Sequence, residues 1–192
     1  MTSFMSESET AQLGFLSVGH NVRVSRFARI YGASRIAIGD DVRIDDFVIL
    51  SAGEAGFEIG THVHLAAHSS IMGAGRVTLG DFSGLSVRVV VLSSTDDFSG
   101  LHLTGPTVPA RYLCVRSESI SIGRHAVIGA GSVILPGAAV GDGAAIGALS
   151  VVKAIVPAFE IHAGCPTRKV GERSRELLAL ERDLSLTPRV RR

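Results

Sequence analysis

A six-residue periodicity limits the fold of this chain more than any other feature of its sequence. Near the C-terminal end, aliphatic residues recur at intervals of six, at Ile122, Ile128, Ile134, Val140, Ile146 and Val152. The same spacing occurs earlier in triplets, at Val18, Val24 and Ile30; Ile38, Ile44 and Leu50; Ile59, Leu65 and Ile71; and Leu79, Leu85 and Val91. This period matches neither a helix, with about 3.6 residues per turn, nor the two-residue alternation of an ordinary strand.

Short strands separated by tight turns account for such a period. The branched aliphatic residue would point inward from each strand, and the glycines would permit turns that a Cβ disfavours. Three hexapeptides would form one triangular coil, and stacked coils would pair as parallel strands about 4.8 Å apart. An aromatic content of only 5% with 22 glycines agrees with a narrow aliphatic core. The sequence therefore predicts an all-β protein, a parallel β-helix of hexapeptide repeats.

Breaks in the repeat divide the chain into five segments. We expect an N-terminal arm or short helix over residues 1–14, β-helix coils over 15–92 and a long loop over 93–119. Further coils follow over 120–160, and residues 161–192 hold a terminal turn, a short C-terminal helix over 171–184 and a basic tail. A loop of this length inside a compact solenoid usually carries function.

Composition narrows the class of protein further. A formal net charge of +1 argues against binding nucleic acid through the whole surface, and 46% hydrophobic residues exclude general disorder. The two cysteines, Cys114 and Cys165, are too few for a disulfide scaffold and lie in no metal-ligand spacing. We recognise no signal peptide, and the uncharged stretch Ala126–Gly141 is too short to span a bilayer. We therefore expect a cytoplasmic protein without a membrane span or a bound metal.

The repeat resembles that of the hexapeptide-repeat acyltransferase superfamily, whose fold is a left-handed parallel β-helix. The likeness covers nearly the whole chain and is closest to sugar acetyltransferases of surface-polysaccharide loci, of the galactoside O-acetyltransferase or dTDP-4-amino-4,6-dideoxyglucose acyltransferase type. The segments that carry the closer match are Leu13–Val22, Ile38–Ser51, Val63–Ser69, Gly80–Val89, Ser94–Pro109 and Ile128–Gly137. The resemblance implies a homotrimer that uses acetyl-CoA to acetylate an amino group or hydroxyl of a sugar, with a nucleotide-linked aminodeoxy sugar as the favoured acceptor. It also implies that the loop over 93–119 projects from the β-helix and helps form the active site with a neighbouring subunit.

The resemblance also implies a binding groove for acetyl-CoA along the C-terminal coils. We expect the backbone at Ala130 and at Gly147 and Ala148 to bind the pantetheine arm. The segment AGCPTRK resembles a terminal signature of the family, so Lys153, Arg168 and Lys169 are candidates for the CoA phosphates. The alternative is that these basic residues only keep the surface soluble.

The catalytic group is less clearly indicated, because Asp96 stands where related loops often carry a histidine general base. One hypothesis makes His64 the base, with Asp96 or Asp97 orienting its ring, since a histidine titrates near neutrality. The other lets Asp96 act directly on an amine, which needs less base assistance than a hydroxyl. Five other histidines are weaker candidates: His20, His62, His68, His102 and His125.

Two other classes of protein remain open. A β-helix can serve as a non-catalytic scaffold or assembly protein, and the missing loop histidine favours that alternative. A zinc enzyme of the carbonic-anhydrase type would need three converging histidines, for which His62, His64 and His68 are the only close set in sequence.

Overall fold

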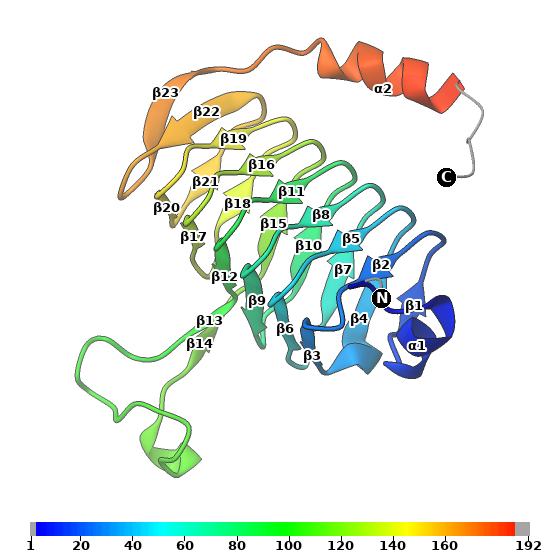
Figure 1. Cartoon of the computed structure of the whole chain (residues 1–192). Helices are drawn as coiled ribbons and strands as arrows, with labels where there is room; N and C mark the ends of the chain where they lie inside the picture. The colour runs from blue at the N-terminus through cyan, green and yellow to red at the C-terminus, as the bar shows by residue number, and fades with distance from the viewer. Residues whose placement is uncertain (1–2, 187–192) are drawn as a thin grey trace.

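The computed structural model describes residues 3–186, and its strands form the three faces of a single parallel β-solenoid (Figure 1). The first face holds β1 (Ser17–Val18), β4 (Ile36–Ile38), β7 (Phe57–Ile59), β10 (Val77–Leu79), β15 (Ile120–Ile122), β18 (Ala139–Val140) and β21 (Ile155–Val156). The second face holds β2 (Arg23–Val24), β5 (Arg43–Ile44), β8 (His64–Leu65), β11 (Gly84–Leu85), β16 (Val127–Ile128), β19 (Ala145–Ile146), β22 (Glu160–Ala163) and β23 (Arg168–Glu172).

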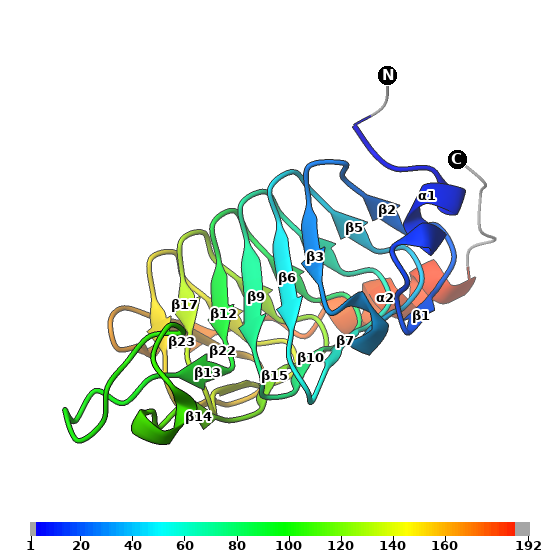
Figure 2. The ribbon, with the colours of Figure 1, turned by 90° about the horizontal axis from the view of Figure 1, so that it is seen from below.

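The third face, seen in Figure 2, completes each coil of the solenoid. It holds β3 (Arg29–Tyr31), β6 (Ile49–Ala52), β9 (Ser70–Gly73), β12 (Val90–Leu92), β17 (Val133–Ile134) and β20 (Val151–Val152). Consecutive strands pass from face to face, so each strand of the faces except β23 pairs in parallel with the strand one coil away. The predicted fold class, a parallel β-solenoid with a short C-terminal helix, is confirmed.

The repeating aliphatic residues fill the inside of the solenoid in columns. In the second face the column comprises Val24, Ile44, Leu65, Leu85, Ile128 and Ile146, each at most 3% exposed. Each triplet of the sequence pattern spans one coil and places its three members on three different faces. The corresponding members of successive triplets pair with each other one coil apart. The hydrophobic burial of these columns supplies the main driving force for folding.

A row of glycines at the end of the first face lets the coils stack closely. The row comprises Gly19, Gly39, Gly60, Gly80, Gly123 and Gly141, and a Cβ on Gly39 would lie 2.8 Å from the carbonyl carbon of Gly60. Beside this row, an aspartate in every second coil accepts a backbone N–H from the coil before it. Asp40 accepts from His20 at 2.8 Å, and Asp81 accepts from Thr61 at 2.7 Å. These bonds fix one corner of the solenoid.

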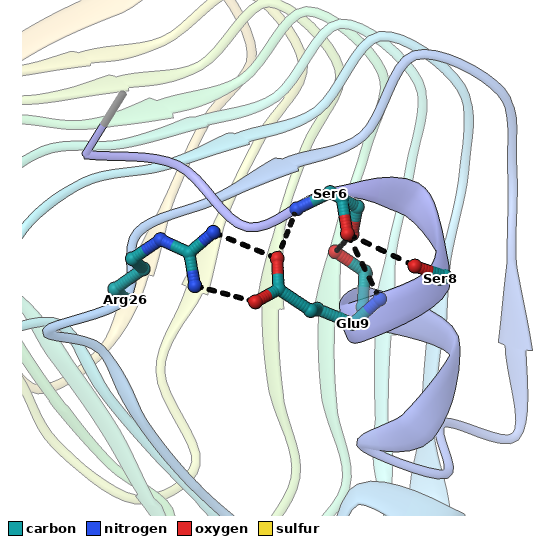
Figure 3. Close-up of polar contacts among 5 residues, drawn as sticks. Ser6, Ser8, Glu9 and Arg26 are labelled. Atoms are coloured by element: carbon teal, nitrogen blue, oxygen red, sulfur yellow. Dashed lines mark hydrogen bonds and ion pairs between the residues drawn. The ribbon is translucent and has the colours of Figure 1, made fainter. Parts of the chain in front are cut away.

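Helix α1 (Glu7–Gln12) closes the N-terminal end. Ser6 and Glu9 form a reciprocal capping box, and Arg26 of the first coil donates two hydrogen bonds to Glu9, at 2.6 and 2.7 Å (Figure 3). Arg26 and the backbone and hydroxyl of Ser6 lower the pKa of Glu9 to about 2. The helix therefore covers the open edge of the first coil, which would otherwise expose unpaired backbone groups.

The C-terminal segment differs from the sequence prediction. The helix expected over 171–184 begins only at Leu177, as α2 (Leu177–Leu186). Strand β23 occupies Arg168–Glu172 because this segment pairs antiparallel with β22. Glu181 of α2 contacts Arg124 and His125, so α2 lies against a corner of the coils. The predicted basic tail lies largely in residues 187–192, outside the described residues.

None of the helices within residues 3–186 has the length and apolar character needed to span a membrane.

Candidate functional site

The loop over residues 93–119 leaves the solenoid after β12, from the fourth coil, and projects away from it (Figures 1 and 2). Its stem is an antiparallel pair, β13 (Ser94–Thr95) and β14 (Arg116–Ser117). The Ser94 hydroxyl lies 2.8 Å from the Ser117 hydroxyl and accepts the Ala74 N–H at 2.8 Å. Farther out, the 3-10 helix η2 (Ala110–Tyr112) folds back so that the Leu103 N–H bonds the Tyr112 carbonyl at 2.9 Å. The loop is thus a folded element with its own hydrogen bonds.

The two predicted catalytic aspartates of the loop have different surroundings. Asp96 follows β13 directly, is exposed, and its carboxylate bonds no other described side chain. Asp97 is bonded by the N–H and hydroxyl of Ser99 and by the N–H and ring of His102. The Ser99 hydroxyl, the Ser99 N–H and His102 together hold the pKa of Asp97 well below its ordinary value.

His64, the predicted general base, extends from the second face and is about half exposed. Its Nε2 lies 2.8 Å from Asp45 Oδ2, while Arg43 Nε donates to Asp45 Oδ1 at 2.6 Å. Burial acts to raise the pKa of Asp45, but the bonds from His64 and Arg43 outweigh it and lower that pKa overall. Sequence reasoning missed Asp45, although it lies 19 residues before His64, close to one coil of the repeat.

Within one chain, His64 is not brought to Asp96 or Asp97. His64 begins β8 on the second face in the third coil, whereas the loop leaves the end of the third face in the fourth coil. The carboxylate that orients His64 within this chain is Asp45, and an orienting role for Asp96 or Asp97 would require a neighbouring chain. A cavity of about 230 Å³ lies beside this pair, lined by Ser3, Phe4, Arg43, Asp45, Asp46 and Ala67.

The remaining candidate histidines of the solenoid lie at its corners. His62 and His125 stack on opposite sides of Phe82, with ring centroids 4.7 and 4.9 Å apart, and His68 stacks on Phe47 at 4.9 Å. His20 lies in the first coil, with its Nδ1 3.4 Å from Asp40. His62, His64 and His68 therefore do not converge, and residues 3–186 contain no group of three or more His, Cys, Asp or Glu arranged to hold a metal.

The three backbone positions expected to bind pantetheine lie together. Ala130 and Ala148 occupy the same corner of the fifth and sixth coils, where the Leu149 N–H donates to the Ala130 carbonyl at 2.9 Å. The Ser132 hydroxyl fixes the neighbouring Gly147 carbonyl at 3.0 Å. The N–H groups of Ala130 and Ala148 donate to no other residue in the described range, so both remain available as hydrogen-bond donors one coil apart.

The three basic candidates are not equivalent. Lys169 donates to Glu160 at 2.8 Å and to Glu172 at 3.1 Å, and these two carboxylates raise its pKa. The guanidinium of Arg168 bonds only the Thr167 carbonyl among the described residues. Lys153 is exposed and has no ion pair in that range. Arg168 and Lys153 therefore have the more available charges for an anion.

One outward row of the second face changes character along the solenoid. The paired registers of its strands place Arg23, Arg43 and His64 in the first three coils, followed by Gly84, Val127, Ala145 and Ile161. The row is basic at the N-terminal end and small or apolar at the C-terminal end. The change falls at the fourth coil, which is also the coil that carries the projecting loop.

A groove of about 830 Å³ runs along the first face. It is lined mainly by small side chains and by the glycine row, and it contains none of the predicted site residues. We assign no ligand to it, because it offers few polar groups that converge.

Comparison with known proteins supports the same assignment of fold. The family model for bacterial transferase hexapeptides (six repeats) matches residues 119–154. A dTDP-4-amino-4,6-dideoxy-D-glucose acyltransferase of Escherichia coli is 45% identical over 179 residues, which cover 93% of each chain.

Solved structures extend this similarity to the whole coil arrangement. AntD, an N-acyltransferase from Bacillus cereus, was solved as a variant with dTDP-4-amino-4,6-dideoxyglucose and coenzyme A. It matches with a TM-score of 0.92 and 40% identity over 96% of this chain and 98% of its own. A second AntD structure, with dTDP and 3-hydroxybutyryl-CoA, gives the same TM-score at 41% identity, over 96% of this chain and 97% of its own. A maltose O-acetyltransferase from Clostridium difficile, at 20% identity and a TM-score of 0.57 over 88% of this chain and 75% of its own, shares the fold alone.

Proposed function

The chain belongs to the hexapeptide-repeat acyltransferases, and on that premise we propose that it transfers an acyl group from acyl-CoA to the amino group of dTDP-4-amino-4,6-dideoxyglucose. The observation that carries this proposal is the 45% identity over 93% of both chains to an acyltransferase of that sugar nucleotide. The family resemblance predicted from the sequence is thereby confirmed. Of the two acceptor groups that the sequence left open, the names of both relatives favour the amine over the hydroxyl.

The proposed reaction needs little covalent chemistry from the protein. The neutral amine attacks the thioester carbonyl, a C–N bond forms, and the tetrahedral oxyanion collapses with cleavage of the C–S bond. The amine loses one proton, and the CoA thiolate leaves and takes up a proton. An amine is a stronger nucleophile than a hydroxyl, so the protein must mainly remove the ammonium proton and hold the two substrates in line.

We assign the proton-accepting role to Asp96 and expect His64 of a neighbouring chain to complete the site, so that loss of either residue removes turnover. Asp96 is exposed on a loop that its stem holds in place, and its carboxylate is not consumed by other described side chains. It can therefore bind an ammonium group and accept its proton. His64 is oriented by Asp45, which leaves Nδ1 of its ring open toward solvent or a substrate.

The two substrates are proposed to approach from opposite ends of the second face. The available N–H groups of Ala130 and Ala148 suit the amides of a pantetheine arm, and Arg168 and Lys153 suit the CoA phosphates. The end that carries His64 is left for the sugar nucleotide. The two would meet at the level of the fourth coil, where the loop leaves the solenoid.

The acyl group and the assembly are finer parts of the proposal. We expect acetyl-CoA as the cosubstrate, although the relative AntD binds 3-hydroxybutyryl-CoA. We expect a homotrimer, because the chain on its own places His64 and Asp96 on different sides of the solenoid. Phe98 and Leu101 of the loop are 92% and 82% exposed, which suits a loop that packs on a neighbouring copy. We expect the enzyme to act in the cytoplasm, in the synthesis of surface polysaccharide.

A thiol-release assay tests the proposal against the scaffold alternative. Purified protein is mixed with acetyl-CoA and, in turn, dTDP-4-amino-4,6-dideoxyglucose, a free galactoside and no acceptor. We expect CoA release only with the amino sugar nucleotide. No release with any acceptor, together with no heat of CoA binding in calorimetry, would leave the non-catalytic scaffold as the better description.

A further inference from the structure

The adjacent aspartates at the start of the loop differ in how many donors reach their carboxylates. For Asp97, Oδ1 accepts the Ser99 N–H at 2.8 Å, and Oδ2 accepts the Ser99 hydroxyl at 2.9 Å. Oδ2 also accepts the His102 N–H at 3.1 Å and lies 3.0 Å from His102 Nδ1. An ionised carboxylate only accepts hydrogen bonds, so His102 Nδ1 carries the proton in this contact. Asp96 has no such set of donors.

We propose that Asp97 and His102 are positioning residues, which close the turn over residues 97–102 and so hold Asp96 toward the acceptor amine. The inference rests on the proposed function and divides the roles within the aspartate pair: Asp96 touches the substrate, and Asp97 does not. Three of the four donors converge on Oδ2, so a proton taken up there would displace at least one of them. Its side chain is also only 15% exposed, which leaves little room for a substrate amine.

The surroundings of Asp96 explain why this turn matters. On the N-terminal side, the β13–β14 stem pairs Thr95 with Arg116 and is tied to the solenoid by the Ser94 hydroxyl. On the C-terminal side, the residue next to Asp96 is Asp97 itself. The backbone of Asp96 is therefore held from both sides, and loss of the Asp97–His102 contact would release its C-terminal side. A displacement of about 1 Å at a reacting group can lower a rate by about 100-fold.

The electrostatics of the loop agree with this division. The Ser99 hydroxyl and N–H, followed by His102, keep the pKa of Asp97 well below its ordinary value. A carboxylate with so low a pKa is a weak base at neutral pH, since efficient general bases titrate near the working pH. Asp97 is thus suited to organise the loop as a permanent anion.

Substitutions at His102 and Asp97 test the proposal in the full-length enzyme. Steady-state rates with acyl-CoA and the amino sugar nucleotide are measured for His102→Ala, His102→Gln, Asp97→Asn and the double variant His102→Ala/Asp97→Asn. We expect His102→Ala to lower kcat by about 10-fold, with the KM for acyl-CoA within about twofold of the wild type. His102→Gln keeps a donor to Asp97 and should recover most of the lost rate.

Two further readouts separate positioning from direct proton transfer. If Asp97 and His102 act as one unit, the double variant should be no slower than the slower single variant. Backbone hydrogen exchange of residues 97–104 should be faster in His102→Ala than in the wild type or His102→Gln. His20→Ala removes an exposed histidine that also contacts an aspartate, at 3.4 Å in the first coil, and serves as the matched control.

Several outcomes would overturn the proposal. A wild-type kcat in His102→Ala would overturn it. A much larger loss of rate in Asp97→Asn than in His102→Ala, with unchanged hydrogen exchange, would also overturn it, since that result would make Asp97 the reacting group. If the wild type transfers no acyl group to the amino sugar nucleotide, the proposed function fails and this inference fails with it. Transfer by the wild type with an insensitive His102→Ala variant defeats the positioning role alone.

Discussion

At the scale of single residues, three carboxylates of the candidate site differ in what they can do. Asp45 is shared between His64 and Arg43, and Asp97 is shared between Ser99 and His102. Asp96 alone is exposed with its carboxylate unbonded by other described side chains. A carboxylate that must bind a substrate ammonium group needs free lone pairs, so Asp96 is the best suited of the three.

Replacing Asp96 with asparagine should therefore remove the proton acceptor while keeping the shape of the side chain. We expect kcat to fall by about 100-fold, in the range usual for loss of a general base, with acyl-CoA affinity unchanged. Steady-state kinetics and calorimetric titration with CoA measure the two quantities. Glu54→Gln, at an exposed corner carboxylate, is the control. An Asp96→Asn enzyme as fast as the wild type would remove Asp96 from the mechanism.

The sequence predicts the directions of the aliphatic side chains but not the contacts of the polar ones. The register of the repeat predicts which aliphatic side chains point inward, because each position in a hexapeptide has a fixed direction. It does not predict contacts between polar side chains of successive coils, since these depend on the two or three extra residues at one corner. The partner of His64 was missed for this reason. The contact between Asp97 and His102 was missed because both residues lie in the loop, where the repeat stops and no longer sets the direction of a side chain.

At the scale of elements, the coils depend on positions where no side chain fits. Glycines end most strands of the first face because the next coil lies directly over them. The sequence pattern predicted these strands well, whereas the helix expected over 171–184 began too early. Leucine spacing alone indicated that helix, but the pairing of Arg168–Glu172 with β22 is a long-range contact that spacing does not encode.

Adding one methyl group to the glycine row should destabilise the solenoid. A Cβ at Gly39 would lie 2.8 Å from the backbone of Gly60, whereas a Cβ at Gly84 would meet nothing closer than 3.8 Å. We expect Gly39→Ala to lower the free energy of unfolding by about 1–3 kcal/mol, and Gly84→Ala to change it much less. Urea denaturation followed by circular dichroism compares the two. Equal stability of both variants would contradict the close stacking described for this row.

The contact of Glu9 with Arg26 should make the stability of the N-terminal end depend on pH. Because folding lowers the pKa of Glu9 from 4.5 to about 2, its contribution is present above pH 4.5 and is lost as the pH falls toward 2. We expect Glu9→Gln to flatten the pH dependence of the urea midpoint between these values, and Glu7→Gln to leave it unchanged. An identical pH dependence in the wild type and Glu9→Gln would show that the contact adds nothing to stability.

At the scale of the whole molecule, we propose that neighbouring chains share the site. His64 and Asp96 belong to different sides of the solenoid, and the loop that carries Asp96 projects away from it (Figure 1). A shared site between copies of the chain brings such groups together, as closed symmetric oligomers commonly do.

Mixing two inactive variants should restore activity if neighbouring chains share the site. His64→Ala and Asp96→Asn are co-expressed in equal amounts, so about one quarter of the sites would combine an intact face with an intact loop. We expect about one quarter of the wild-type kcat in the mixture, against little activity in either variant alone. If the mixtures form normal oligomers but regain no activity, the whole site lies within one chain.

An enzyme that joins an acyl group to nitrogen on a dTDP-linked sugar must produce an amide, so identification of the product is the decisive experiment. The enzyme is offered acetyl-CoA with dTDP-4-amino-4,6-dideoxyglucose or with the matched dTDP sugar that carries a hydroxyl at the same carbon, and products are analysed by mass spectrometry and NMR. We expect an amide from the amino sugar nucleotide and no ester from the hydroxyl compound. Ester formation at comparable rates, or unchanged substrates in both reactions, would show that the chain is not a specific N-acyltransferase of this sugar nucleotide.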